Sequence, residues 1–241
     1  QLDPGNGKTK QAYLWAYRSN DLQRGPKIIV FDYQAGRSGR YAQQFLDEWQ
    51  GHLLVDDYSG YKALFATRRA HPQSLRLLEP CTELACLAHV RRKFFDLFQS
   101  SQSPIAQEAL NRIAHVYAVE VEARDFSTAA RQQLRAEKSL PALTALHDWL
   151  QQTRLRTAPS TPTAKAIDHS LKRWVALTRY AETGDLPIDN NPVENSIRPI
   201  ALGKKNWLFA GSERAGQRAA VIQSLLGTAK LNGLDPAAWL K

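Results

Sequence analysis

The sequence predicts an α/β fold, and three observations carry that expectation. Two short runs rich in aromatic and β-branched residues, 11–18 and 27–33, are typical of strands. A run with helical spacing, 41–50, and a third strand-like run, 52–56, follow, so the chain begins in the order strand, strand, helix, strand. Beyond residue 94, apolar residues recur three and four positions apart, which is typical of helices that pack on a core.

The first two strands are expected to form a hairpin, because the segment between them is rich in residues that favour turns. The helix that follows is predicted from three apolar residues at helical spacing: Phe45, Leu46 and Trp49. From 94 to 182 the chain is predicted to be a helical subdomain, interrupted by a loop at 158–163.

The C-terminal part is predicted to contain a helix start, a loop and a long helix. Three residues suited to a helix N-cap, Asp189, Asn190 and Asn191, precede Pro192, which suits a first helical position. Residues 204–212 are expected to form a loop or short strand. Residues 214–232 are expected to form an amphipathic helix that ends at Gly233, before a short helix that Asp235 and Pro236 start. In the helix predicted at 214–232, the residues expected to face the core are Val221, Ile222, Leu225, Leu226 and Ala229.

Composition excludes several classes of protein. The chain has 241 residues, of which 43% are hydrophobic, so it is not a disordered polymer. It has no run of about 18 apolar residues, so no transmembrane helix and no membrane partner is expected, and its two cysteines favour a reducing compartment. The net charge of +9 favours a polyanionic partner such as nucleic acid. Much of the positive excess lies in residues 61–185, with 18 basic and 12 acidic side chains.

Asp56 is the first candidate for chemistry. It ends an apolar strand-like run, and a carboxylate at the carboxyl end of a strand is well placed to hold a divalent cation such as Mg²⁺. The string Asp-Asp-Tyr-Ser-Gly is also ordinary turn chemistry. The residues by themselves favour the turn.

Glu194 is the second candidate, within the string DNNPVENSIRP at a predicted helix start. Local rules explain it by a bond back to the cap residue Asn191, or by an ion pair with Arg198 one turn later. The density of amide, carboxylate and guanidinium groups in this string is the observation that also fits a functional site.

Cys86 and His89 form a C-x-x-H motif that basic residues follow directly. A structural zinc site needs four ligands, and Cys81 supplies only a third. The simpler interpretations are a buried thiol and a hydrogen-bonded core histidine. The run Arg91, Arg92 and Lys93 fits either a solvated helix face or a contact to phosphate.

Residues 204–207 join two lysines, an amide and a large aromatic side chain, which suits a nucleic-acid groove: Lys204, Lys205, Asn206 and Trp207. A basic surface loop with Trp207 anchored in the core explains the same residues. The string GNGKTK (5–10) lacks the spacing of a phosphate-binding loop and precedes a strand, so it is discounted.

Taken together, four strings resemble the transposases of the insertion-sequence-66 family. They are GHLLVDDYSGYKAL (51–64), CLAHVRRKFFDL (86–97), DNNPVENSIRPIALGKKNWLFAGS (189–212) and TAKLNGLDPAAWL (228–240). The resemblance covers nearly the whole chain in order, and the match of the third string is long and specific.

The resemblance implies a DDE transposase with a ribonuclease-H-like mixed sheet core, a large all-helical insertion and a helical C-terminus. Residues 1–93 would form the first part of the core, 94–182 the insertion and 183–241 the remaining part. Asp56 and Glu194 would be the second and third catalytic carboxylates and would bind two Mg²⁺ or Mn²⁺ ions, so we expect them to approach each other.

The resemblance also implies supporting and DNA-binding residues. Cys86, His89 and Asn191 would support the site near the metals. The C-x-x-H motif of Cys86 and His89 would not hold zinc. The DNA contacts would come from basic and stacking side chains: Arg91, Arg92, Arg198, Lys204, Lys205, Asn206 and Trp207. The partners would be the insertion-sequence ends and target DNA, further copies of the protein in a homo-oligomer on DNA, and accessory proteins of the same element.

One departure concerns the first carboxylate of the family, which lies in a strand expected just before residue 1. Asp3, in a Pro-Gly turn, and Asp32 are poor substitutes for it, so the chain is expected to be inactive by itself. Two other classes remain open: a metal-dependent nuclease of the same fold, and a nucleic-acid-binding module without catalysis. Joining of DNA strands separates the first from a transposase, and indifference to Mg²⁺ identifies the second.

Overall fold

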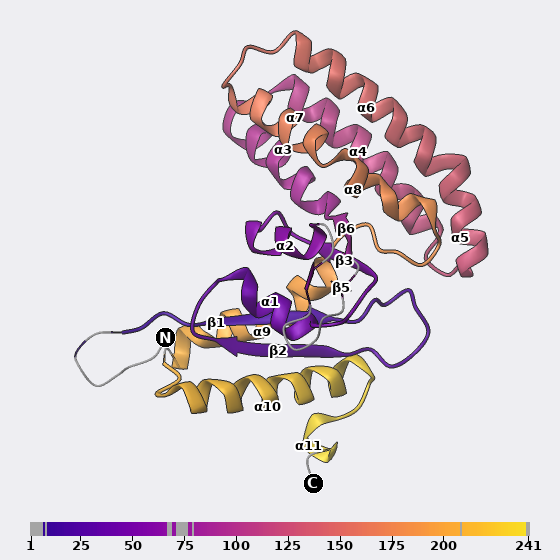
Figure 1. Cartoon of the computed structure of the whole chain (residues 1–241). Helices are drawn as coiled ribbons and strands as arrows, with labels where there is room; N and C mark the ends of the chain where they lie inside the picture. Colours follow the sequence, from indigo (N-terminus) through magenta and orange to yellow (C-terminus); the bar gives the residue numbers. More distant parts are fainter. Residues whose placement is uncertain are drawn as a thin grey trace. The chain divides into compact units, whose positions relative to one another are not determined.

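The computed structural model describes residues 7, 9–66, 69–70, 77–78, 80–207 and 209–239. The chain forms two compact units (Figure 1). We call Gln1–Gly51, Tyr58–Cys81 and Asn191–Lys241 the hairpin unit, and His52–Asp57 and Thr82–Asn190 the helical unit.

Both units combine helices with short strands. The hairpin unit has β1 (Tyr13–Arg18), β2 (Ile29–Gln34), α1 (Gly39–Leu46), the 3₁₀ turn η1 (Ser59–Tyr61), α2 (Lys62–Phe65), β4 (Arg69–Ala70), β5 (Leu77–Leu78), α9 (Asn191–Trp207), α10 (Glu213–Leu231) and α11 (Pro236–Trp239). The helical unit has β3 (His52–Val55), β6 (Thr82–Ala85), α3 (Leu87–Ser101), α4 (Pro104–Glu122), α5 (Thr128–Leu134), the π-helical turn η2 (Arg135–Ser139), α6 (Leu140–Leu155), α7 (Pro162–Lys172), α8 (Trp174–Thr178) and the 3₁₀ turn η3 (Arg179–Glu182).

The predicted hairpin is confirmed. Strands β1 and β2 pair antiparallel, with Tyr13 opposite Gln34 and Arg18 opposite Ile29. Ile29 and Phe31 point into a small core that Ile200 of α9 and Ala220 of α10 complete. The hairpin is thus packed on helices from the other end of the chain.

Helix α10 runs along β2 and pairs with its outer edge (Figure 1). The Ser224 hydroxyl accepts from Phe31 N at 2.8 Å, the Thr228 hydroxyl accepts from Ile29 N at 3.1 Å, and Asn232 bonds both backbone groups of Lys27. The spacing matches because four helical residues rise about 6 Å and two strand residues about 6.8 Å. Side chains of α10 therefore cover a strand edge that would otherwise expose unpaired backbone groups.

The face of α10 that packs on the hairpin consists of small residues, which contradicts the prediction from its apolar side chains. A Cβ on Gly216 would lie 2.3 Å from the Tyr33 ring, and one on Gly227 would lie 2.7 Å from Ile29. By contrast, three of the predicted core residues are exposed: Val221, Ile222 and Leu225. The prediction was wrong because close approach and edge pairing need small and hydroxyl side chains. Ala229 is buried, as predicted.

The C-terminal elements otherwise follow the sequence, with one correction. Gly233 has a φ of +72° and follows α10, where Leu234 N bonds Ala229 O at 3.0 Å and completes the predicted helix end. Residues 204–207, predicted to be a loop or strand, form the last turn of α9. Lysines there stabilise the carboxyl end of the helix through its dipole, which explains the difference.

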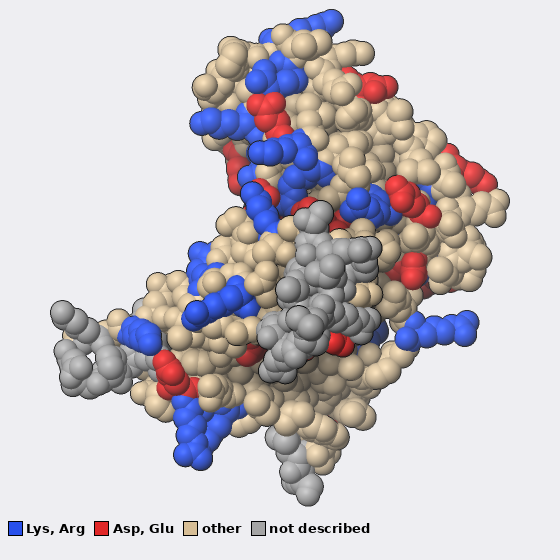
Figure 2. All heavy atoms as spheres, in the orientation of Figure 1, with Lys and Arg blue, Asp and Glu red and all other residues tan. Residues whose placement is uncertain are grey.

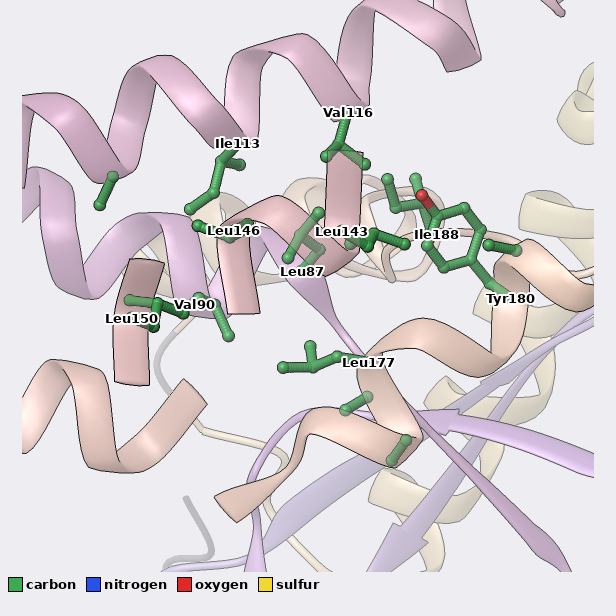
Figure 3. Close-up of a cluster of buried hydrophobic side chains, with 14 of the residues drawn as sticks. Leu87, Val90, Ile113, Val116, Leu143, Leu146, Leu150, Leu177, Tyr180 and Ile188 are labelled. Atoms are coloured by element: carbon green, nitrogen blue, oxygen red, sulfur yellow. The ribbon is translucent and has the colours of Figure 1, made fainter. Parts of the chain in front are cut away.

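The core of the helical unit is built from apolar side chains of several helices, and part of it comes from residues at helical spacing beyond residue 94 (Figure 3). Side chains from α3, α4, α6, α8 and η3 converge, and those labelled in the figure include Leu87, Val90, Ile113, Val116, Leu143, Leu146, Leu150, Leu177 and Tyr180. Residues 94–182 contain helices and turns but no strand, and a loop separates α6 from α7, as predicted.

The sheets of the described residues are smaller than the mixed sheet core that the resemblance implies. The described residues form three two-stranded sheets: β1–β2, the parallel pair β3–β6, and β4–β5. The fold is therefore a mixed α/β structure that is mostly helical. Among the described residues, no helix combines the length and apolar character needed to cross a membrane.

Candidate active site

The site begins at the carboxyl ends of the parallel strands β3 and β6 in the helical unit. Val55, the last residue of β3, lies opposite Ala85, the last residue of β6. Asp56 and Cys86 follow these two residues directly. Side chains that leave adjacent parallel strands at the same edge share one end of the sheet.

Cys86 connects this edge to the string DNNPVEN. Its buried thiol donates to Asn190 Oδ1 at 3.0 Å, and Asn190 N donates to the sulfur at 3.4 Å. Burial raises the pKa of the Cys86 thiol to about 11, so the sulfur stays protonated at neutral pH. A protonated, hydrogen-bonded thiol is a support for the loop rather than a metal-binding thiolate.

Two further contacts hold the residues that precede α9. Tyr117 OH of α4 donates to Asp189 Oδ2 at 2.8 Å, and Leu87 N donates to Ile188 O at 3.1 Å. Burial, followed by the Asp189 charge, raises the pKa of Tyr117, so the phenol remains a donor. The segment Ile188–Asn190 is therefore anchored beside the first turn of α3, at the same strand ends as Asp56.

Glu194 lies in the first turn of α9, in the hairpin unit. The start of this helix is held by Arg18 of β1, which donates to Pro192 O at 3.0 Å and to Ser196 Oγ at 2.7 Å. Asp21 accepts two bonds from the same guanidinium, at 2.6 and 2.8 Å. The helix turn that carries Glu194 is thus fixed to the hairpin.

Asp56 and Glu194 belong to different units, so their approach remains a prediction. Both offer oxygen ligands, as hard cations such as Mg²⁺ require. Within the ranges that the structure describes, no group of three His, Cys, Asp or Glu side chains is assembled to hold a metal. The donor chemistry of the two carboxylates fits Mg²⁺, with phosphate oxygens and water as further ligands.

Asp57, the neighbour of Asp56, contacts two residues at the end of α7. Arg173 Nη1 donates to Asp57 Oδ1 at 2.7 Å, and His169 Nδ1 lies 3.2 Å from Oδ2. Arg173 Nη2 donates to Glu83 Oε1 of β6 at 2.6 Å. Burial, then the charge of Lys93, lowers the pKa of His169 to about 4 against the opposing effect of Asp57. His169 is therefore neutral at pH 7.

The basic candidates lie on exposed helix surfaces. Arg91 and Arg92 are exposed on α3, and Arg91 stands over the Phe95 ring at 5.9 Å. On α9 the exposed candidates are Arg198, Lys204, Lys205 and Asn206, whereas the side chain of Trp207 lies outside the described residues. On the visible face of the helical unit, Lys and Arg gather over the side where α3 and α7 lie (Figure 2).

Sequence reasoning missed four residues that organise the site. The local sequence predicts only a helix-cap role for Asn190, which belongs to the string DNNPVEN. Tyr117, Arg18 and Arg173 carried no local signal, because each acts on a residue far away in the sequence.

Comparison with known proteins adds a family. Residues 1–218 match the profile of the family described as Transposase IS66 family. Three relatives from Sinorhizobium fredii are similar. The uncharacterized protein y4jD is 36% identical over 100% of this chain and 47% of its own length. The uncharacterized proteins y4qI and y4hP are 37% and 33% identical, over 99% and 94% of this chain and 44% and 43% of their own lengths.

The chain thus spans less than half the length of these relatives. No solved structure matches the chain.

Proposed function

The chain belongs to the IS66 family of transposases, and from this premise we propose that it contributes Asp56 and Glu194 to a catalytic site that cleaves and joins DNA at insertion-sequence ends. The protein would act on DNA in the bacterial cytoplasm as a homo-oligomer. In this proposal the ribonuclease-H-like core comprises residues 1–93 and 183–241, with 94–182 as a helical insertion.

One observation carries the proposal. Asn190 of the string DNNPVEN is bonded to Cys86, which leaves β6 beside the strand end that carries Asp56. The described contacts thus hold Asn190, the residue directly before α9, at the carboxyl ends of β3 and β6. This arrangement supports a site built from two carboxylates that are remote in sequence.

The chemistry follows from the charge of these residues. Two divalent cations, when bound, would supply an activated attacking hydroxyl and stabilise the leaving oxygen of a phosphodiester. Asp56 and Glu194 would hold them with anionic oxygen ligands. Cys86, His89 and Asn191 would keep the surrounding loops in place, since the protonated Cys86 thiol suits hydrogen bonding rather than Mg²⁺.

DNA would be held by cations on exposed helix surfaces. Arg198, Lys204 and Lys205 follow Glu194 along α9, and Arg91 and Arg92 follow Cys86 along α3. Exposed Lys and Arg bind the DNA backbone with an affinity that falls as salt rises. Asn206 and Trp207 at the end of α9 would contact bases of a frayed end.

The test uses the full-length protein and DNA fragments that carry the boundaries of the genetic element encoding it. With Mg²⁺ we expect cleavage at the element end and joining to target DNA. Asp56→Asn and Glu194→Gln should each lower both reactions by at least about a hundredfold, because loss of a metal ligand removes several kcal/mol of transition-state stabilisation. Asp32→Asn is the matched control and should leave both unchanged, since Asp32 bonds Gln34 within β2.

The same experiment separates the alternatives. Cleavage without joining would assign a nuclease, and DNA binding that is indifferent to Mg²⁺ would assign a binding module. The double change Lys204→Gln and Lys205→Gln should weaken DNA binding and flatten its dependence on salt, without altering cleavage at saturating DNA.

A further inference from the structure

We propose that Arg173 is a positioning residue for the metal-binding strand end: together with His169 it holds Asp57, and thereby directs the adjacent Asp56 toward the metals. The inference rests on the proposed function, because it takes Asp56 as a metal ligand. It assigns a role in the reaction to residues 94–182, the proposed helical insertion, because Arg173 and His169 both belong to it.

Asp57, the second of the two aspartates that follow β3, is held through both of its carboxylate oxygens. Asp57 has one oxygen 2.7 Å from Arg173 Nη1 and the other 3.2 Å from His169 Nδ1. A metal ion at Asp57 would have to compete with these two partners for the carboxylate oxygens. Asp56 and Asp57 are adjacent in the chain directly after β3, so fixing the Asp57 side chain restricts the backbone that carries Asp56.

Arg173 also ties the two parallel strands together. Its second terminal nitrogen donates to Glu83 of β6 at 2.6 Å, and Glu83 stands opposite Leu53 of β3. Arg179, at the start of η3, donates to the Glu83 carbonyl oxygen. The arginine side chain is only 13% exposed, so this bridge is partly shielded from water. A planar guanidinium that binds two carboxylates at fixed angles orients them more strictly than a lysine can.

The bridge also lowers the negative charge beside Asp56. Adjacent carboxylates repel each other, and an uncompensated Asp57 would compete for the metal or distort the ligand geometry. Arg173 compensates the negative charge of Asp57 through their ion pair. The positive charge of Lys93 also acts on His169, the second partner of Asp57. A compensated Asp57 competes less with Asp56 for a bound cation.

The test compares three variants in the full-length protein. Arg173→Gln and Asp57→Asn remove the two sides of the bridge. Arg154→Gln is the matched control: Arg154 bonds Asp168 at 2.6 Å in the same unit, but this pair does not involve β3 or β6. Two quantities are measured: the Mn²⁺ concentration that half-saturates the metal-induced rise in melting temperature, and the Mg²⁺ concentration that half-saturates DNA cleavage.

We expect Arg173→Gln and Asp57→Asn to raise both half-saturating concentrations by about tenfold, the loss typical of outer partners of a metal ligand. Cleavage should approach the unaltered rate at saturating Mg²⁺. Arg173→Lys should recover only part of the loss, because an ammonium cannot bind both carboxylates in the fork geometry. Arg154→Gln should lower the melting temperature slightly and leave both concentrations unchanged.

Other outcomes overturn the inference. If Arg173→Gln changes only the melting temperature, as the control does, Arg173 is merely structural. If Asp57→Asn abolishes the metal-induced shift as completely as Asp56→Asn, Asp57 is itself a ligand. A failure of the proposed function looks different, because the unaltered protein would then show neither a metal-induced shift nor Mg²⁺-dependent cleavage.

Discussion

Replacing Arg135 by methionine tests how the helical unit holds the segment that leads to the site. Arg135 is fully buried in η2. Its guanidinium binds both oxygens of Glu120, with Nε–Oε1 at 3.0 Å and Nη2–Oε2 at 2.6 Å. Nη1 lies within 2.9 Å of three carbonyl oxygens, those of Tyr180, Thr183 and Leu186. One side chain thus fixes the chain a few residues before Asp189.

The magnitude follows from these contacts. Methionine is long and flexible enough to fill much of the same volume, so the loss is mainly electrostatic. Glu120, whose side chain is 16% exposed, would keep its charge without its cation. Breaking a buried pair by removing one partner costs about 3–5 kcal/mol, and the three carbonyl groups left without this donor belong to that cost.

The assay is urea denaturation of the chain, followed by circular dichroism. Lys138→Met is the matched control in the same turn, since Lys138 binds Glu122 at 2.7 Å with both side chains about half exposed. An exposed pair of this kind contributes less than about 1 kcal/mol. The double variant Arg135→Met with Glu120→Gln should lose less than the sum of its single changes, because the buried charge is removed as well. A cost for Arg135→Met no larger than that of Lys138→Met would refute the reasoning.

Two further predictions concern the hairpin and pH. Ser224→Ala and Thr228→Val should each lower the free energy of unfolding by about 1–2 kcal/mol, because the amides of Phe31 and Ile29 lose their acceptors. Thr228→Ser keeps the hydroxyl and should retain most of the stability. Equal losses for Thr228→Ser and Thr228→Val in urea titrations would contradict edge pairing. The folded pKa of His169 is lowered to about 4 from the ordinary 6.5, so the unfolded chain binds the proton more readily between these values, and stability should fall as pH drops from about 6.5 toward 4. His169→Gln should flatten this part of the melting-temperature profile between pH 7 and 5, and an unchanged slope would show that other groups cause it.

Local patterns in the sequence predicted the elements that depend on neighbouring residues. The hairpin, the helices of 94–182, the break before α7 and the end of α10 at Gly233 follow from turn residues, periodicity and capping. The strings around Asp56 and Glu194 led to the transposase family, because such strings carry chemistry as well as structure. These signals act within a few residues, so the sequence alone contains them.

Tertiary structure decided which side chains meet across long separations. The buried face of α10 could not be identified from its apolar stripe, because the edge of β2 selects hydroxyls and glycines at those positions. The contact of Cys86 with Asn190, and that of Arg173 with Asp57 and Glu83, join residues about a hundred positions apart. Hydrogen bonds and ion pairs of this kind depend on a geometry that exists only after the strands and helices have packed, and so no local pattern marks them.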